Sequence, residues 1–336
     1  MQEKPSNKHF HVAGLGNALM DALIVLDSDT LIETEGLNKG IMHAVDHDRW
    51  MDVFGKVDQD QVVLQTGGSC ANTIAALGLM GATVSYCGHV ANDEFGQEYK
   101  SQFQAACGQH SIVTGAGHTG KCLSLVSQDA ERTMLTDLGT SVQLDGLGDF
   151  ADVIRNAQVF YSTGYLLLGD PMKSRLIEGA EIAKAAGVPV ALDVADPFVI
   201  HAVKEDMKQF ITDYCDMVFL NEEEAKAITG STEATDAIAA LQDVCSTIVV
   251  KLGKRGAVVY SNGQTAKTGV EPVKPIDTTG AGDSFAAGFL FGFTNGYSLE
   301  QSVKLATKVA GETITQVGAV VRTPGRLAEL AKSVVG

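Results

Sequence analysis

Short apolar runs alternate along the chain with longer segments in which apolar residues recur at helical spacing. Continuous apolar strands that alternate with helices are typical of a parallel sheet covered on both faces. The pattern therefore predicts an α/β fold with three layers, α/β/α, around a mostly parallel central sheet. The runs that predict strands are 11–15, 83–87, 159–161, 188–192, 217–220 and 247–251. The segments that predict helices include 71–80, 95–106, 172–186, 222–228, 234–244, 284–293 and 299–315.

Two segments interrupt this alternation. The first, within about 21–48, is strand-like and rich in turns, and the second, within about 118–144, alternates as strands around a turn at 128–130. Neither has the pattern of a helix that crosses between parallel strands. We therefore expect a single domain over residues 1–336, in which these two segments form a small β lid over one end of the main sheet. Such a lid can close on a ligand and exclude water.

The charge of the chain limits its partners. The formal net charge is −16 at pH 7. Broad binding to nucleic acid or to anionic membranes needs basic faces, so we expect neither partner. A chain this acidic can still hold phosphates if it uses local devices, namely backbone N–H groups, a helix N-terminus and a metal ion.

The six cysteines and the N-terminal segment bear on the compartment. No two cysteines have the C-x-x-C spacing that zinc ribbons and thioredoxin-like sites need. The first ten residues are polar and lack the apolar core of a signal peptide, and the apolar stretch 285–293 is too short to span a bilayer. These features predict a cytoplasmic protein.

The strongest chemical pattern is DTTGAGD at 277–283, which runs straight into an apolar helix. The first turn of a helix has unpaired N–H groups and the positive end of the helix dipole, and glycines let a phosphate approach the backbone. We therefore interpret Gly280, Ala281 and Gly282 as an anion hole for a transferring phosphoryl group. Asp283 then becomes the candidate catalytic base that accepts a proton from a hydroxyl. The alternative is an aspartate that only caps the helix.

The segment 277–289 closely resembles the second signature of the ribokinase-like (PfkB) carbohydrate and nucleoside kinases. The segment 67–73, GGSCANT, resembles the first signature, and the two lie in the expected order. The resemblance covers nearly the whole chain. It implies a phosphotransferase that uses ATP and Mg²⁺ and an alcohol group as acceptor, and it includes a homodimer through the lid among the expected assemblies.

The resemblance also implies an acceptor pocket at the carboxyl ends of the strands. Two glycines of the first signature line this pocket in the family, and an aspartate after the first strand grips the hydroxyls of the acceptor. From the residues alone, the glycine pair can equally form a tight turn between a strand and a helix. Apolar side chains would form the walls around a base or sugar ring. The implied substrate contacts are Asn17, Asp21, Gly67, Gly68, Asn72, Leu138 and Tyr165.

On the nucleotide side, Asn221 and Glu224 match an Asn-x-x-Glu element that organises magnesium, often through water. The alternative for Glu224 is an acidic helix start favoured by the helix dipole. Lys251, Gly253 and Gly256 match the loop of the family that lies under the ATP, and a hairpin turn is the alternative for the two glycines.

Two further matches are implied by the resemblance. Asp277 and Thr279 match positions where relatives hold a monovalent cation such as K⁺ through backbone oxygens. Arg132 lies on the predicted lid, where nucleoside kinases carry an arginine that meets the phosphates on closure. A surface ion pair with a neighbouring acid is an equal alternative for Arg132.

Local details favour a nucleoside over a sugar as acceptor. They are the spacing of Asn17 and Asp21, the segment 119–140, and the segment 194–198, all of which resemble nucleoside kinases of the family. We therefore expect phosphorylation of a primary hydroxyl, the 5′-hydroxyl of an adenosine-like nucleoside. A furanose or keto sugar, as in ribokinase- or fructokinase-type enzymes, is the alternative.

Other patterns are set aside. The segment 115–122 is nearly a Walker A loop, but a strand follows it where a helix is needed. His43 and His47 lie four residues apart, but no third strong metal ligand is visible beside them, so a solvated stretch is favoured. An oxidoreductase of the dinucleotide-binding class lacks its third glycine. A non-catalytic nucleotide binder has no need of the base at Asp283.

Overall fold

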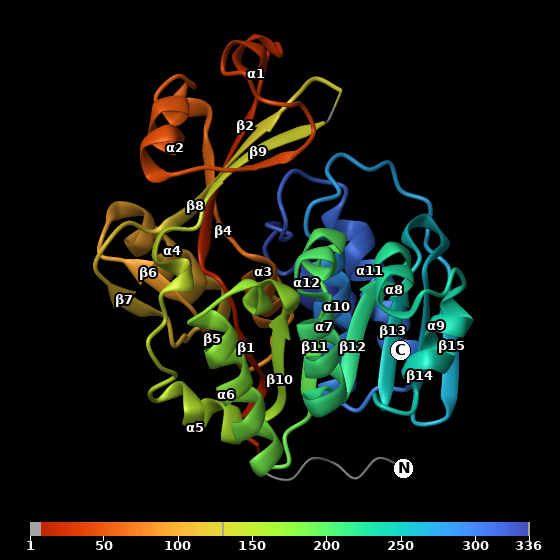
Figure 1. Ribbon diagram of the computed structural model, residues 1–336. Helices are drawn as coiled ribbons and strands as arrows, with labels where there is room; N and C mark the ends of the chain where they lie inside the picture. The colour runs from red at the N-terminus through yellow and green to blue at the C-terminus, as the bar shows by residue number, and fades with distance from the viewer. Residues whose placement is uncertain (1–7, 130, 335–336) are drawn as a thin grey trace.

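The computed structural model describes residues 8–129 and 131–334, so the first seven residues of the polar N-terminal segment lie outside it. An eight-stranded sheet forms the middle layer, in the order β15-β14-β13-β12-β11-β10-β1-β5 (Figure 1). The strands from β5 to β13 in this order pair in parallel, and the last two pair antiparallel. All six apolar runs form strands as predicted. Their bounds are β1 Phe10–Leu15, β5 Val84–Cys87, β10 Ala157–Thr163, β11 Val190–Asp193, β12 Met217–Asn221 and β13 Thr247–Lys251, followed by β14 Ala257–Ser261 and β15 Gln264–Thr268.

Helices cover both faces of this sheet, and successive strand residues alternate between two apolar cores. Val12 packs into one core and its neighbour Ala13 into the other, because side chains alternate across a strand. The predicted three-layer α/β/α architecture is thereby confirmed. One face carries α3 Ser69–Leu79, α10 Ala281–Thr294, α11 Leu299–Thr313 and α12 Arg326–Lys332, with α4 Glu94–Cys107 packed on α3. The other carries α5 Phe150–Arg155, α6 Met172–Ala185, α7 Pro197–Tyr214, α8 Glu222–Thr229 and α9 Ala234–Leu241.

A second sheet forms the lid at one end of the molecule, in the order β3-β9-β8-β2-β4 (Figure 1). Two helices pack on one of its faces around the buried Trp50. The sequence predicted only β structure within about 21–48 and 118–144, so β4 and both helices are additions. The bounds are β2 Leu19–Val25, β3 Met42–Ala44, β4 Val63–Gly67, β8 Gly120–Val126, β9 Arg132–Asp137, α1 Thr30–Thr34 and α2 His47–Phe54.

The edge of the lid sheet formed by β4 is covered by the side-chain amide of Gln102. Gln102 Oε1 accepts from the backbone N–H of Thr66 at 2.9 Å, and Gln102 Nε2 donates to the carbonyl of Leu64 at 3.2 Å. The glutamine therefore takes the place of a neighbouring strand along β4, which blunts edge-to-edge pairing there. The homodimer through the lid stays a prediction.

Short elements complete the fold. A two-stranded sheet joins β6 His89–Ala91 to β7 Val113–Gly115, and the 3₁₀ turns are η1 Gln59–Gln61, η2 Gly139–Val142, η3 Gly164–Leu168 and η4 Gly253–Arg255. Within the described ranges, no helix is both long enough and apolar enough to cross a bilayer.

Candidate active site

The N-terminus of α10 carries the predicted anion hole. Gly280 is the N-cap residue and adopts φ +69°, and a Cβ there would lie 2.3 Å from the carbonyl oxygen of Ala319. Only glycine fits this left-handed, crowded position. Ala281 and Gly282 follow in the first turn, where the helix has no acceptors of its own for the N–H groups. The backbone therefore presents donors and the positive helix end at one place.

Asp283 lies in the same turn, and its carboxylate joins the two signature segments. Ser69 Oγ donates to Oδ1 at 2.5 Å, and Asn72 Nδ2 donates to Oδ2 at 2.9 Å. Burial raises the pKa of this carboxyl to about 6, although the two donors act in the opposite direction. The carboxylate does not cap the helix, because the N-cap residue is Gly280 and no side chain caps α10. A buried base with a pKa near the physiological range is suited to accept a proton from an alcohol.

Asp21 lies on β2 of the lid and pairs with Gln65 of β4, two residues before Gly67. A Cβ on Gly67 would lie 2.3 to 2.5 Å from the carboxylate atoms of Asp21, so the absence of a side chain there lets β4 pass over the acid. The pKa of Asp21 is raised to about 7, chiefly by burial; Arg132 acts against this rise, and Asp283 and Asp277 contribute to it. The carboxyl groups of Asp21 and Asp283 therefore lie close enough to influence each other's ionisation.

The turn before α3 lies against the loop after β1. Gly68 adopts φ +93°, and a Cβ there would lie 2.2 Å from the carbonyl oxygen of Asn17, so this glycine is also required by the backbone. The side-chain oxygens of Asn17 and Asn72 are buried and have no hydrogen-bond partner among the described residues. Buried unpaired acceptors are costly, and a ligand with hydroxyl donors would satisfy them.

Arg132 links the lid to the loop before α10. Its Nη1 lies 3.6 Å from Asp277 Oδ1, and its Nη2 donates to Ser124 Oγ at 3.2 Å. Asp277 Oδ1 also accepts from the backbone N–H of Thr279 at 2.9 Å, and Oδ2 accepts from that of Gly318 at 2.9 Å. The ion pair of Arg132 is therefore made with the loop before α10 and not with an acid beside it in the sequence.

The nucleotide side shows a buried acidic helix start. Asn221 and Glu224 form a reciprocal capping box at α8, so the alternative structural role predicted for Glu224 is present. Burial raises the pKa of Glu224 to about 7, Lys251 lowers it and Asp193 raises it. Lys251 Nζ donates to Asp193 Oδ2 at 2.8 Å. Asp193 was not predicted, although an aspartate at the end of a buried strand is a usable signal.

The other residues predicted to contact ATP or the acceptor differ in how far they are buried. Gly256 adopts φ +90°, and a Cβ there would lie 1.8 Å from the carbonyl oxygen of Thr268. The packing of the β14–β15 hairpin is therefore a sufficient reason for glycine at this position, without any contact to ATP. Gly253 is exposed in the turn η4. Leu138 is exposed at the end of β9, whereas Tyr165 is half-buried, and burial followed by the nearby acids raises the pKa of its phenol. Ser69, inside the first signature, is a further residue that the sequence analysis did not assign.

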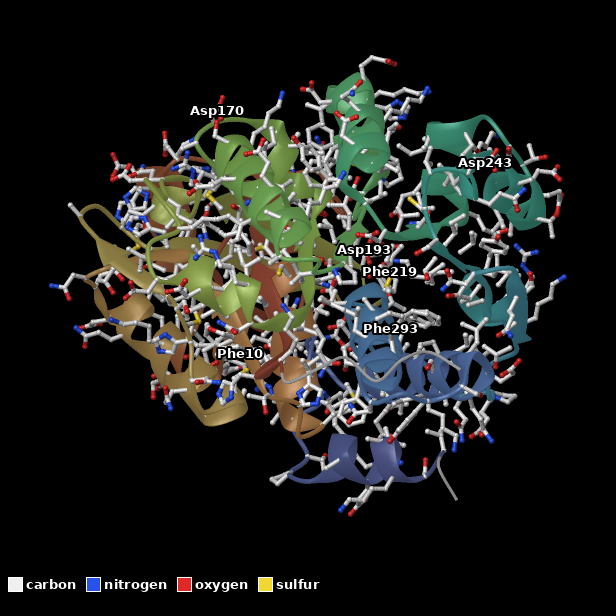
Figure 2. The ribbon with its side chains drawn as sticks, turned by 90° about the horizontal axis from the view of Figure 1, so that it is seen from below. Phe10, Asp170, Asp193, Phe219, Asp243 and Phe293 are labelled. Carbon is white, nitrogen blue, oxygen red and sulfur yellow. The ribbon has the colours of Figure 1, made fainter. Side chains whose placement is uncertain are left out.

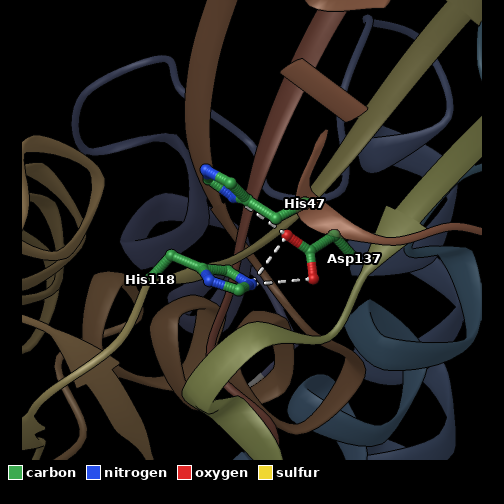
Figure 3. Close-up of side chains that lie close together, drawn as sticks. All are labelled: His47, His118 and Asp137. Carbon is green, nitrogen blue, oxygen red and sulfur yellow. Dashed lines mark hydrogen bonds and ion pairs between the residues drawn. The ribbon is translucent and has the colours of Figure 1, made fainter. Parts of the chain in front are cut away.

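Two histidines and an aspartate meet at the base of the lid (Figure 3). The ligand atoms of His47, His118 and Asp137 lie within 4.8 Å of one another, as a metal site would require. However, the ammonium of Lys121 lies 2.9 Å from His47 Nδ1 and 2.8 Å from Asp137 Oδ2. A buried lysine thus holds the position that a metal ion would take. His43 is not part of this group and accepts from the backbone N–H of Asn38.

Comparisons with known proteins identify the family. The family described as "pfkB family carbohydrate kinase" matches residues 44–325. Adenosine kinase from Saccharomyces cerevisiae is 28% identical over 329 residues, covering 90% of this chain and 94% of that protein. The crystal structure of adenosine kinase from Sinorhizobium meliloti superimposes with a TM-score of 0.85 at 33% identity, covering 96% of this chain and 99% of that one. A probable sugar kinase from Rhizobium etli superimposes with a TM-score of 0.86 at 29% identity, covering 98% and 99%.

The two signatures, the position of Asp283 in the first turn of α10 and these matches agree, and relatives that are kinases imply that ATP is used. The chain is therefore a kinase with the ribokinase-like fold, and it belongs to the pfkB family of carbohydrate kinases.

Proposed function

We propose that the protein transfers the γ-phosphoryl group of ATP to the 5′-hydroxyl of adenosine or a related nucleoside. The observation that carries the proposal is the buried carboxylate of Asp283 in the same helical turn as the amides of Ala281 and Gly282. The adenosine kinases among the similar proteins support a nucleoside as the acceptor.

In the transfer, a bond forms between the acceptor hydroxyl oxygen and the γ-phosphorus. The bond from that phosphorus to the bridging oxygen breaks, and the oxygen leaves with ADP and the bonding electrons. The proton of the hydroxyl passes to Asp283, and the amides at residues 280–282 stabilise the charge on the transferring group. Asp21 and Asn17 would orient the acceptor through its other hydroxyls. Arg132 would exchange Asp277 for phosphate oxygens when the lid closes.

Asn221 and Glu224 suit a hydrated Mg²⁺. Glu224 is 1% exposed, and both of its carboxylate oxygens already accept from Asn221, so contact through water fits better than direct coordination. A bound Mg²⁺ would neutralise charge on the phosphates. For K⁺, the carboxylate of Asp277 is occupied by Thr279 and Gly318, so backbone oxygens of this loop are the ligands that remain.

A sugar kinase is the second candidate, because a probable sugar kinase superimposes over nearly the whole chain. A screen of purified protein with ATP and Mg²⁺ against adenosine, inosine, guanosine, ribose and fructose separates the two. We expect release of ADP with adenosine, and mass spectrometry of the product should show a nucleoside 5′-monophosphate. Turnover of ribose or fructose with none of a nucleoside would refute the nucleoside assignment and favour the second candidate.

The compartment that we propose is the cytoplasm. All six cysteines are free, and most of them are buried. Free thiols without a disulfide framework fit a reducing compartment.

A further inference from the structure

Lys251 extends from the carboxyl end of β13 to the start of α10. Its side chain is 14% exposed, and its ammonium lies 2.8 Å from Asp193 Oδ2. A Cβ built on Gly282 would lie 3.2 Å from the same ammonium nitrogen. The ammonium of Lys251 therefore lies beside the backbone of the proposed anion hole as well as beside Asp193. Because residue 282 is a glycine, no side chain stands between this ammonium and the backbone of α10.

The partner of Lys251 is itself fixed in position. Asp193 ends β11 beside Phe219 of the neighbouring strand (Figure 2), and its side chain is 2% exposed. Its second oxygen, Oδ1, accepts from the backbone N–H of Ala195 at 3.1 Å, and Ala195 adopts φ +79°. Because the turn and the buried strand end fix the Asp193 carboxylate, this carboxylate can hold the ammonium of Lys251 in one position.

The electrostatics keep the lysine charged. Burial alone would lower the pKa of Lys251, but the carboxylates of Asp193 and Glu224 outweigh burial and raise it above the usual value. Asp283 acts in the same direction. A fixed ammonium next to the first turn of α10 adds a full positive charge to the partial charge of the helix end.

We propose that Lys251 is a further catalytic residue, whose ammonium contacts the oxygens of the transferring phosphoryl group at the anion hole, and that Asp193 positions it. The inference rests on the proposed phosphoryl transfer but not on which acceptor is used. Lys251 keeps its proton throughout, because the hydroxyl proton goes to Asp283. Its contribution is charge stabilisation as the bond to ADP breaks. The competing explanation is that Lys251 only neutralises the buried charge of Asp193.

A pair of variants separates these explanations. Lys251→Met removes the ammonium but leaves the Asp193 carboxylate buried without a partner, which can impair folding. The double variant Lys251→Met with Asp193→Asn removes both charges and so avoids that problem. Lys267→Met, at an exposed lysine of β15, is the matched control.

We expect the single and the double variant to lower kcat by about 100- to 1,000-fold, as loss of one donor to a developing charge does, with a smaller change in the KM of the acceptor. The control should keep wild-type kinetics. Asp193→Asn alone should lower kcat to an intermediate value, because the ammonium remains but is no longer oriented. If the double variant regains wild-type turnover, Lys251 only offsets the charge of Asp193 and the inference is wrong.

The stabilisation of the protein by a non-hydrolysable ATP analogue with Mg²⁺ gives a readout that needs no acceptor. We expect the analogue to raise Tm less in the double variant than in the wild type. An equal rise in both proteins would count against contact between Lys251 and the phosphates. A wild type that turns over no acceptor would refute the proposed function, whereas an active wild type matched by an equally active double variant would refute only the role of Lys251.

Discussion

Replacing Asp283 with asparagine should stabilise the protein while strongly lowering its turnover. Burial raises the pKa of this carboxyl from an ordinary 3.8 to about 6. The folded chain therefore holds the ionised carboxylate less favourably than the unfolded chain does. The difference corresponds to about 3 kcal/mol at neutral pH, since each pKa unit is worth about 1.36 kcal/mol.

Asparagine has nearly the same shape as aspartate and carries no charge. Its amide can keep a hydrogen bond with Ser69, and Asn72 can offer its unpartnered side-chain oxygen by rotating its amide. We expect Asp283→Asn to raise the free energy of unfolding at pH 7 by up to about 3 kcal/mol. Because the hydroxyl proton then has no acceptor, turnover should fall by about 100- to 10,000-fold.

The pH dependence gives this prediction a defined sign. A carboxyl whose pKa is raised by folding contributes stability below its unfolded value of 3.8, and the protein loses that contribution as the pH rises through about 6. The advantage of Asp283→Asn should therefore be full at pH 7 to 8 and should vanish near pH 4. Denaturant unfolding of both proteins without ligand, at several pH values, measures it. Asp243→Asn is the control, at an exposed carboxyl just after α9 (Figure 2).

Two results would refute this reasoning. A variant less stable than the wild type at pH 7, or an advantage that is equal at pH 5 and pH 8, would show that the carboxylate is not held unfavourably. Unchanged ADP production would show that Asp283 is not the base.

Three further predictions follow from the same contacts. Gly67→Ala should raise the KM of the acceptor at least tenfold and leave ATP affinity nearly unchanged, because the new Cβ would displace the Asp21 carboxylate; steady-state kinetics with each substrate varied would check this. Lys121→Met should cost about 3 kcal/mol of stability by removing the ammonium that pairs with the buried carboxylate of Asp137, and adding Asp137→Asn should recover most of it in denaturant unfolding. The kcat/KM of the wild type should fall about tenfold per pH unit below about pH 6, where Asp283 becomes protonated, and a flat profile down to pH 5 would contradict the assigned base.

The central sheet could be predicted because its strands are buried on both faces and therefore read as continuous apolar runs. The helix α7 was missed, although Asp196 followed by Pro197 is a helix start: the side chain of Asp196 accepts from the backbone N–H of Phe198, and proline stands at the first helical positions. The lid helix α2 was missed because it is short, with eight residues of which only half are apolar. Its start signal was the cap at Asp46.

The site was predictable where a motif is local in sequence and not where partners are distant. The turn at residues 280–282 and the base at Asp283 follow from one short segment. Nothing in the sequence pairs Ser69 with a residue 214 positions away, or Lys251 with one 58 positions away. Such pairs depend on which strands are neighbours, and strand order is a property of the folded sheet.

The buried acids of the site explain how so acidic a protein can handle a highly charged anion. Burial raises the pKa of Asp21, Asp283 and Glu224 to about 7, 6 and 7, so ionised carboxylates are held at a cost in the free protein. The negative charge of a nucleotide that binds in such a site must be compensated by positive charge. Lys251, Arg132 and the N-terminal end of α10 supply part of this positive charge. A divalent cation near Glu224 would supply the rest. We therefore infer that the nucleotide binds together with its metal, and that the metal-free nucleotide binds markedly more weakly.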